Sequence, residues 1–408
     1  MDRLNEAARR PTPYSSAAYI QAFLENDEYA GPGSEPWLLV ARRGHEPVGL
    51  LPLRRVRTRV LGLPSTRAEF LVQYDSDRPA AICRAADDVE VSRAFYRHLL
   101  RETTGIDMIE FVAQEEGSGL FPPPADLLAG WYARTLEGVP NATIPLGGLD
   151  TASWFRSLSR KHKQNVARRA RKLLATGTVE YVTSDDPAAR PGLLDLYLSL
   201  ERRGWKRERG VGRHPARIGL LRALCHPACP HALSFAFLLL DGLPVAAAIY
   251  GAFGDYYVEE ETTYDESLGP LSPGNLLKVL TVADAIEQGK QAMNLLGDFA
   301  YYKARWGAVI SPTRTLQIFR RGRVPWAKAR AGELRRRLFG NPETQVGADH
   351  NLAKREVEDA VEPEVGAAAP DRREAQAEAV RILAALRSSG AGLRILGGAE
   401  LRARLPFE

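Results

Sequence analysis

Residues 272–308 read SPGNLLKVLTVADAIEQGKQAMNLLGDFAYYKARWGA, in which a helix, a strand and a charged turn follow one another. Ser272 is placed to cap the helix and Pro273 to open it, apolar residues recur at helical spacing, and Gly289 suits the C-terminus. Residues 291–296 are predicted as a short buried strand, and an aromatic, cationic turn follows them. Polar groups at the end of a strand are a common place for a site.

The size and composition of the chain indicate a globular protein of several domains. Its 408 residues exceed what one hydrophobic core usually serves, and its contents of 45% hydrophobic and 26% charged residues are ordinary for a soluble protein. Three cysteines form no disulfide framework, which fits a reducing compartment. The N-terminal residues contain no signal peptide, and no run is long and apolar enough for a membrane span. We therefore expect a cytoplasmic protein.

The pattern of strands and helices divides the chain into three parts. Residues 1–140 and residues 141–322 each show strands, then helix, then strand, and the last strand of the second part is expected near 313–319. The similar order is consistent with a duplication, and equally with two unrelated α+β domains. Residues 323–408 are rich in Pro, Gly, Ala and charge, so we expect a helical, partly flexible tail.

Residues 154–308 contain a series of short motifs, which are Trp154, Leu158-Ser159, Arg168-Arg169, Arg203-Gly204-Trp205, residues 242–246, Tyr264-Asp265, Ser272-Pro273-Gly274, Gly289, Gly297-Asp298 and residues 302–307. In these motifs the segment resembles the BioF2-like or CelD-like acyltransferase domain of the GCN5-related N-acetyltransferase (GNAT) superfamily, which is close to the Fem-type aminoacyl transferases. The resemblance implies tandem GNAT-like α+β domains, with mixed, mainly antiparallel sheets flanked by helices. The usual coenzyme A loop of the superfamily is not found between residues 264 and 275.

Acyl transfer to an amine needs a base, a cation near the developing oxyanion and aligned substrates. Lys303 is the candidate cation, as a lysine in the similar segment of Fem-type enzymes implies, or it is a surface lysine beside an aromatic ring. Asp298 is a candidate base or a turn cap. Glu261 is a further candidate base or part of an exposed strand edge; it belongs to three successive acids on a predicted strand, which place at least one acid on each face. Tyr302 is a candidate acid for the leaving group, or a core side chain.

Other residues are candidates for binding. The turn formed by Ser272, Gly274 and Asn275 opens a helix, where backbone N–H groups bind anions favourably. Residues 156–172 carry many cations and no acid, so this helix is either a solvated face or a surface for a polyanion, with Arg168 and Arg169 at its centre. The remaining candidates for contact with the substrate are Trp205, Lys206, Tyr264, Arg305 and Trp306.

Three functions follow from these residues and the resemblance. The first is an N-acyltransferase that moves an activated acyl group from acyl-CoA to a small-molecule or carrier-linked amine by direct attack. The second is an aminoacyl-tRNA-dependent transferase with tRNA as partner, and the third is a non-catalytic adaptor in envelope or polysaccharide assembly. We expect no permanently bound cofactor, no DNA partner and no metal, because the prolines between Cys225 and His231 restrict how that loop could wrap an ion.

Overall fold

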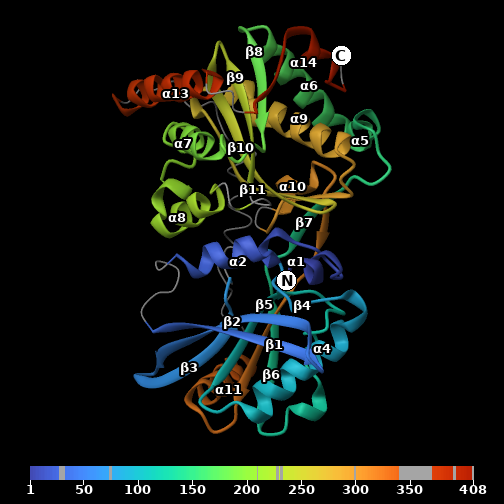
Figure 1. Ribbon diagram of the computed structural model, residues 1–408, viewed down its shortest axis with the longest axis vertical. Helices are drawn as coiled ribbons and strands as arrows, with labels where there is room; N and C mark the ends of the chain where they lie inside the picture. The colour runs from blue at the N-terminus through green and yellow to red at the C-terminus, as the bar shows by residue number, and fades with distance from the viewer. Residues whose placement is uncertain are drawn as a thin grey trace.

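The computed structural model describes residues 1–26, 33–72, 76–208, 210–226, 229, 233–297, 300–339, 370–388 and 392–406. These residues form two mixed sheets flanked by helices, one above the other in Figure 1. The helices α1 (Asp2–Glu6) and α2 (Ala17–Leu24) lie between them. None of the described helices combines the length and the apolar composition that a membrane span requires. The fold is the expected tandem α+β arrangement.

The first sheet carries helices on both faces. Helix α4 (Asp88–Arg97) packs on β1 and β2, and α11 (Val324–Phe339) packs on β14 and β3. The short helices of this part are Ala85–Asp87, His98–Glu102 and Ala125–Leu127. In spatial order the strands are β1 (Ser34–Arg43), β2 (Glu46–Val60), β3 (Leu63–Phe70), β5 (Met108–Gln114), β14 (Arg314–Arg320) and β6 (Trp131–Glu137), with β4 (Ile82–Cys83) paired to β2.

The second sheet is built around an antiparallel meander of the strands β9, β10 and β11. Figure 1 shows α7, α8 and α13 on one of its faces and α5, α6, α9 and α14 on the other. The helices are α5 (Thr151–Ser157), α6 (Arg160–Leu174), α7 (Arg190–Glu201), α8 (Pro215–Leu224), α9 (Pro273–Glu287) and α10 (Ala300–Ala304). In spatial order the strands are β13 (Val309–Ser311), β7 (Asn141–Pro145), β12 (Ala292–Asn294), β11 (Tyr256–Tyr264), β10 (Leu243–Phe253), β9 (Leu233–Leu240), β8 (Val179–Ser184) and β15 (Arg394–Gly397).

The strand expected near 313–319 exists, but its assignment to the second part of the chain is wrong. β14 inserts between β5 and β6 of the first sheet and pairs antiparallel with both. The reason is packing, because Leu316 and Ile318 are buried in the first core together with Ile109 and Phe111. The chain therefore returns to the first sheet after it has built most of the second.

The C-terminal tail contributes a strand as well as helices. Helix α13 (Pro370–Ser388) packs on α7, and β15 extends the second sheet by pairing with β8. Helix α14 (Gly398–Ala403) then packs against both of these strands. Upstream, the basic residues 156–172, which we expected on one helix, lie on two helices, because Asp150 caps the first and Ser159 caps the second. Each capping side chain accepts a hydrogen bond from a backbone N–H in the first turn of its helix, and this bond stabilises the N-terminus of each helix.

An apolar core joins the two parts of the chain. One buried cluster combines Tyr14, Tyr19 and Ile82 of the first part with residues of α7, α8 and β9 of the second. Helix α2 packs on α8 in the same region. The two sheets therefore share a buried boundary, and polar groups within it are held in fixed positions.

Candidate functional site

The pairing of β11 with β12 is short, and we call the place where the two strands part the opening. They pair in parallel over only three positions, from Tyr256 opposite Ala292 to Val258 opposite Asn294. Beyond these pairs the two strands have no ladder bonds to each other. Because unpaired strand ends expose backbone groups and side chains, the segments 259–264 and 295–297 are placed to line a binding site.

A buried lysine and a carboxylate meet beside this opening. Lys278 on α9 is 5% exposed, and its Nζ contacts Oε2 of Glu259 on β11. Tyr250 donates a 3.4 Å hydrogen bond to the same carboxylate oxygen. Burial, and to a smaller extent the neighbouring Lys303 cation, lowers the pKa of Lys278 well below its usual value. The pair therefore places an exchangeable proton between β11 and α9.

Lys303 lies on the other side of the opening. It belongs to α10, and its Nζ donates to the carbonyl oxygen of Leu296 at 3.2 Å and to that of Gly297. Both acceptors are backbone carbonyl oxygens at the end of β12, and they orient the ammonium. Leu296 has a left-handed φ of 62°, which an L side chain adopts only at a cost. A strained strand end thus holds the cation that the sequence singled out.

Glu261 points to the opposite side of β11 from Glu259. A bulge in the pairing with β10 falls at Glu260, so Glu260 and Glu261 both reach Arg217, at 2.9 Å and 3.9 Å. Glu261 also accepts a 2.9 Å bond from Lys206. The expectation that the three acids lie on both faces of the strand is confirmed. Glu261 lies in an ion-pair cluster, and its role as a base stays a prediction.

The turn before α9 is held by the basic helix α6. Arg169 donates through Nη1 to Oγ of Ser272, which in turn donates a 3.1 Å bond to the carbonyl of Gly269. Ser272 has a left-handed φ of 48°, and its side chain does not cap α9. An added Cβ on Gly274 would make ordinary contact with Tyr264 at 3.5 Å, so steric need does not explain that glycine. Asn275 closes the turn through its N–H to Ser272 O.

The remaining candidates fall into exposed and buried groups. Trp205 is 47% exposed, its ring centroid lies 6.5 Å from that of Tyr264, and the Lys206 ammonium lies 5.6 Å from the Trp205 ring. Tyr302 is 45% exposed. Arg168 is exposed on α6 and donates to Asn165. Asp298 lies outside the described residues.

Trp306 is in the core, where it supports the turn. Its ring is fully buried, is stacked on Trp154 and meets the His162 ring edge-on at a centroid distance of 4.5 Å. Its side chain therefore contacts other protein rings. Burial, with the nearby Arg305 cation as a smaller cause, lowers the pKa of His162 to about 4. Arg305 thus lies next to the buried ring pair rather than among the residues of the opening.

Sequence reasoning missed Lys278 and the role of Glu259. The signal was present, because α9 is buried on nearly every side and Lys278 lies among Leu276, Leu277, Val279 and Leu280. A lysine in a helix with no polar face has to be paired or functional.

A comparison of the sequence with protein families finds one match in this region. Residues 160–304 match the family model described as "Acetyltransferase (GNAT) domain". The matched residues contain β11, β12, α9 and the two lysines of the opening. This segment is a GNAT domain. The resemblance stated from the sequence is confirmed for this segment, which the family model describes as an acetyltransferase domain.

Comparison with solved structures gives one likeness that supports the fold of the GNAT domain and its neighbour, and weaker ones with TM-scores below 0.5. A crystal structure titled FemX covers 77% of this chain and 94% of its own, with a TM-score of 0.55 and 12% identity. The structure of L-PGS from Bacillus licheniformis gives a TM-score of 0.46 at 13% identity and covers 80% and 98% of the two chains. A tandem GNAT protein from the clavulanic acid biosynthesis pathway gives 0.42 at 14% identity, over 79% and 94%. No protein with a curated description matches this sequence.

Proposed function

We propose that the protein is an N-acyltransferase that moves an acyl group from acyl-CoA to an amine in the opening between β11 and β12. The observation that carries this proposal is the contact of Lys278 with Glu259, near enough to Lys303 for that cation to act on Lys278, where two parallel strands of a GNAT domain part. A buried proton-exchanging pair and an oriented cation are the groups that direct acyl transfer needs.

The reaction is a direct displacement. The neutral amine attacks the acyl carbonyl carbon, the C–N bond forms, and the C–S bond to coenzyme A breaks. The proton lost by the amine passes to a base of the opening, and the thiolate takes up a proton as it leaves. Lys303 stabilises the oxyanion that develops on the carbonyl, because its ammonium is already oriented by Leu296 and Gly297. We also propose that this proton path includes Asp298, Tyr302 and Glu261.

The phosphates of coenzyme A have a matching surface next to the opening. The first turn of α9 has no side-chain cap, and the Arg169 guanidinium lies against the preceding turn. Backbone N–H groups at a helix start and an adjacent guanidinium both bind phosphate. We infer that Ser272, Gly274 and Asn275 form this contact and that Trp205 and Tyr264 flank the acyl or amine group.

The exposed cations of α5 and α6 favour a second candidate, transfer from an aminoacyl-tRNA. Arg156, Arg160, Lys161, Arg168 and Lys172 are all exposed on these two helices. A polyphosphate backbone would release counterions from such a surface, so binding would weaken steeply with salt.

A ligand screen separates the candidates. Thermal stabilisation by acetyl-CoA and longer acyl-CoA esters, together with release of free thiol in the presence of amines, is expected for the proposed function. Salt-sensitive binding of aminoacyl-tRNA without a response to acyl-CoA would select the second candidate. If neither ligand binds, the protein is not a transferase of these two classes.

A further inference from the structure

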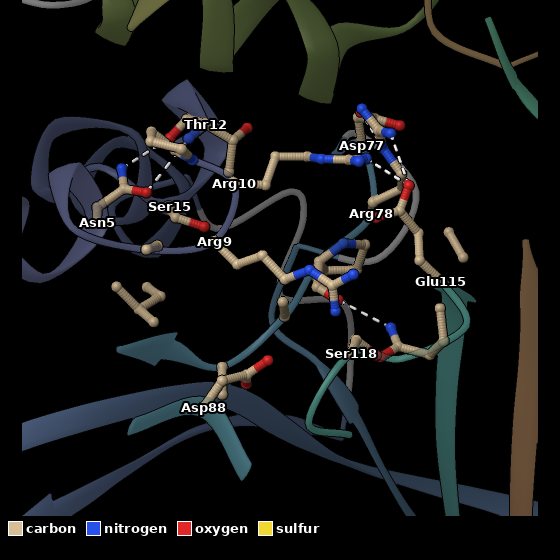
Figure 2. A pocket seen from close by; sticks show the side chains of 18 of the residues that line it. Asn5, Arg9, Arg10, Thr12, Ser15, Asp77, Arg78, Asp88, Glu115 and Ser118 are labelled. Atoms are coloured by element: carbon tan, nitrogen blue, oxygen red, sulfur yellow. Dashed lines mark hydrogen bonds and ion pairs between the residues drawn. The ribbon is translucent and has the colours of Figure 1, made fainter. Parts of the chain in front are cut away.

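A carboxylate from the first part of the chain is hydrogen-bonded to the second sheet. Asp77 follows β3 and lies at the edge of the hollow between the two sheets that Figure 2 shows. Its Oδ1 accepts a 2.8 Å bond from the side-chain amide of Asn141 on β7. Its Oδ2 accepts from the amide of Asn294, the last residue of β12. Asp77 therefore contacts the strand that borders the opening of the GNAT domain.

The side chain of Asn294 links Asp77 to the backbone at the end of β12. Its Oδ1 accepts from the Asn141 amide at 2.9 Å and from the backbone N–H of Leu296 at 2.8 Å. These two bonds fix the orientation of the amide, so its N–H is directed at Asp77. Leu296 is the left-handed residue whose carbonyl accepts from Lys303. Three successive hydrogen bonds thus connect Asp77 with Lys303 through Asn294 and Leu296.

The charge of Asp77 is balanced within the first part of the chain. Arg78 donates to its Oδ2 through Nε and Nη2, both at 2.8 Å. Arg10 points toward the same corner in Figure 2, Glu115 pairs with Arg78 and Arg10, and the Tyr14 hydroxyl is close enough to interact electrostatically. Burial raises the pKa of Asp77 to about 7, although the two amides and Arg10 oppose the shift. The carboxylate therefore changes charge near neutral pH.

We propose that Asp77 is a positioning residue for the site on the GNAT domain, which it serves by holding Asn294, Leu296 and thereby Lys303 in place. Its relevance to catalysis rests on the proposed function. Ionised Asp77 accepts from both amides, whereas the protonated acid presents an O–H to groups that are themselves donors. The strand end that holds Lys303 is therefore best ordered above neutral pH. Asp77 of the first part of the chain thus positions residues of the site on the GNAT domain.

The test uses the full chain with Asp77→Asn and Asp77→Ala, and with Asp88→Asn as matched control. Asp88 is an acid of the same hollow, but it accepts from Ser92 and Gly119 of the first part of the chain. Hydrogen exchange of the peptide 292–306, followed by mass spectrometry, reports on the strand end without any substrate. We expect both Asp77 variants to speed exchange there about tenfold and Asp88→Asn to leave it unchanged.

Turnover with acetyl-CoA and an amine acceptor supplies the second readout. Both Asp77 variants should lower kcat about tenfold with little change in the KM for acetyl-CoA, because a displaced cation affects the transition state more than donor binding. The rise of kcat through pH 7 should disappear in Asp77→Asn. Unchanged exchange at 292–306 in both variants overturns the inference about Asp77. If the wild-type chain transfers no acyl group, the proposed function fails, and the exchange result still decides whether Asp77 holds the strand end.

Discussion

Lys278 contacts Glu259 inside a helix–sheet interface in which nearly all the neighbouring side chains are apolar. A buried ion pair of this kind is weak support for stability, because desolvation of both groups offsets most of their attraction. Removal of one partner is different, since it leaves the other charge buried without compensation. The pair is therefore better explained by chemistry at the opening than by stability of the fold.

The first prediction concerns this pair. Lys278→Met should lower the free energy of unfolding by about 3 kcal/mol, because Glu259 is left unpaired. The double variant with Glu259→Gln should recover most of that loss while acyl transfer stays impaired. Urea unfolding and thiol release measure the two effects separately. Full activity in the double variant would mean that the pair is only structural.

The second prediction concerns the oriented cation. Lys303→Met should lower kcat at least about tenfold, the scale of a lost charge-stabilising contact, with little change in the unfolding midpoint. Lys303→Arg keeps a charge at this position and serves as the control for charge alone. A Lys303→Met chain with wild-type kcat would remove this residue from the mechanism.

The third prediction separates the two neighbouring arginines of α6. Arg169→Ala should raise the Kd for coenzyme A about tenfold, because it removes the guanidinium that holds the turn before α9. Arg168→Ala is the matched control, since Arg168 is exposed and donates to Asn165 within its own helix. Calorimetry at fixed salt measures both. Equal Kd values for the two variants would exclude the proposed phosphate contact at Arg169.

The fourth prediction concerns the pH dependence of stability. The pKa of His162 is about 4 in the folded protein, below the usual value of 6.5, so the unfolded chain binds more protons between these values. Stability should therefore fall as the pH drops from about 6.5 to 4, by on the order of 3 kcal/mol from this residue. His162→Phe should remove that part of the fall. Parallel urea curves for both proteins across this pH range test it.

Local patterns in the sequence were sufficient for the meander and for α9. The dipeptides Asp241-Gly242 and Gly254-Asp255, which favour hairpin turns, join β9, β10 and β11, and Pro273 opens α9, although the side chain of Ser272 does not cap that helix. The placement of β14 could not be predicted in this way. Its burial pattern fits either sheet, and the pairing partners β5 and β6 lie about 200 residues earlier in the chain.

The site was predicted in part for the same reason. The aromatic and cationic residues around Lys303 predicted a charged turn after a strand. The structure places that lysine on the short helix α10, with its ammonium at the end of β12. The pairing of Lys278 with Glu259 joins a helix to a strand, and the contact of Asp77 with Asn294 joins residues 217 positions apart. Single-sequence periodicity carries no information on contacts of such range.

The insertion of β14 has a consequence for cutting the chain. A cut at residue 312 would remove an interior strand, so β5 and β6 would each lose a partner on one side and the first core would open to water. The two halves are therefore not separable at a single point. A fragment that ends before β14 would expose unpaired strand edges at β5 and β6. We therefore expect such a fragment to aggregate instead of folding as a separate domain.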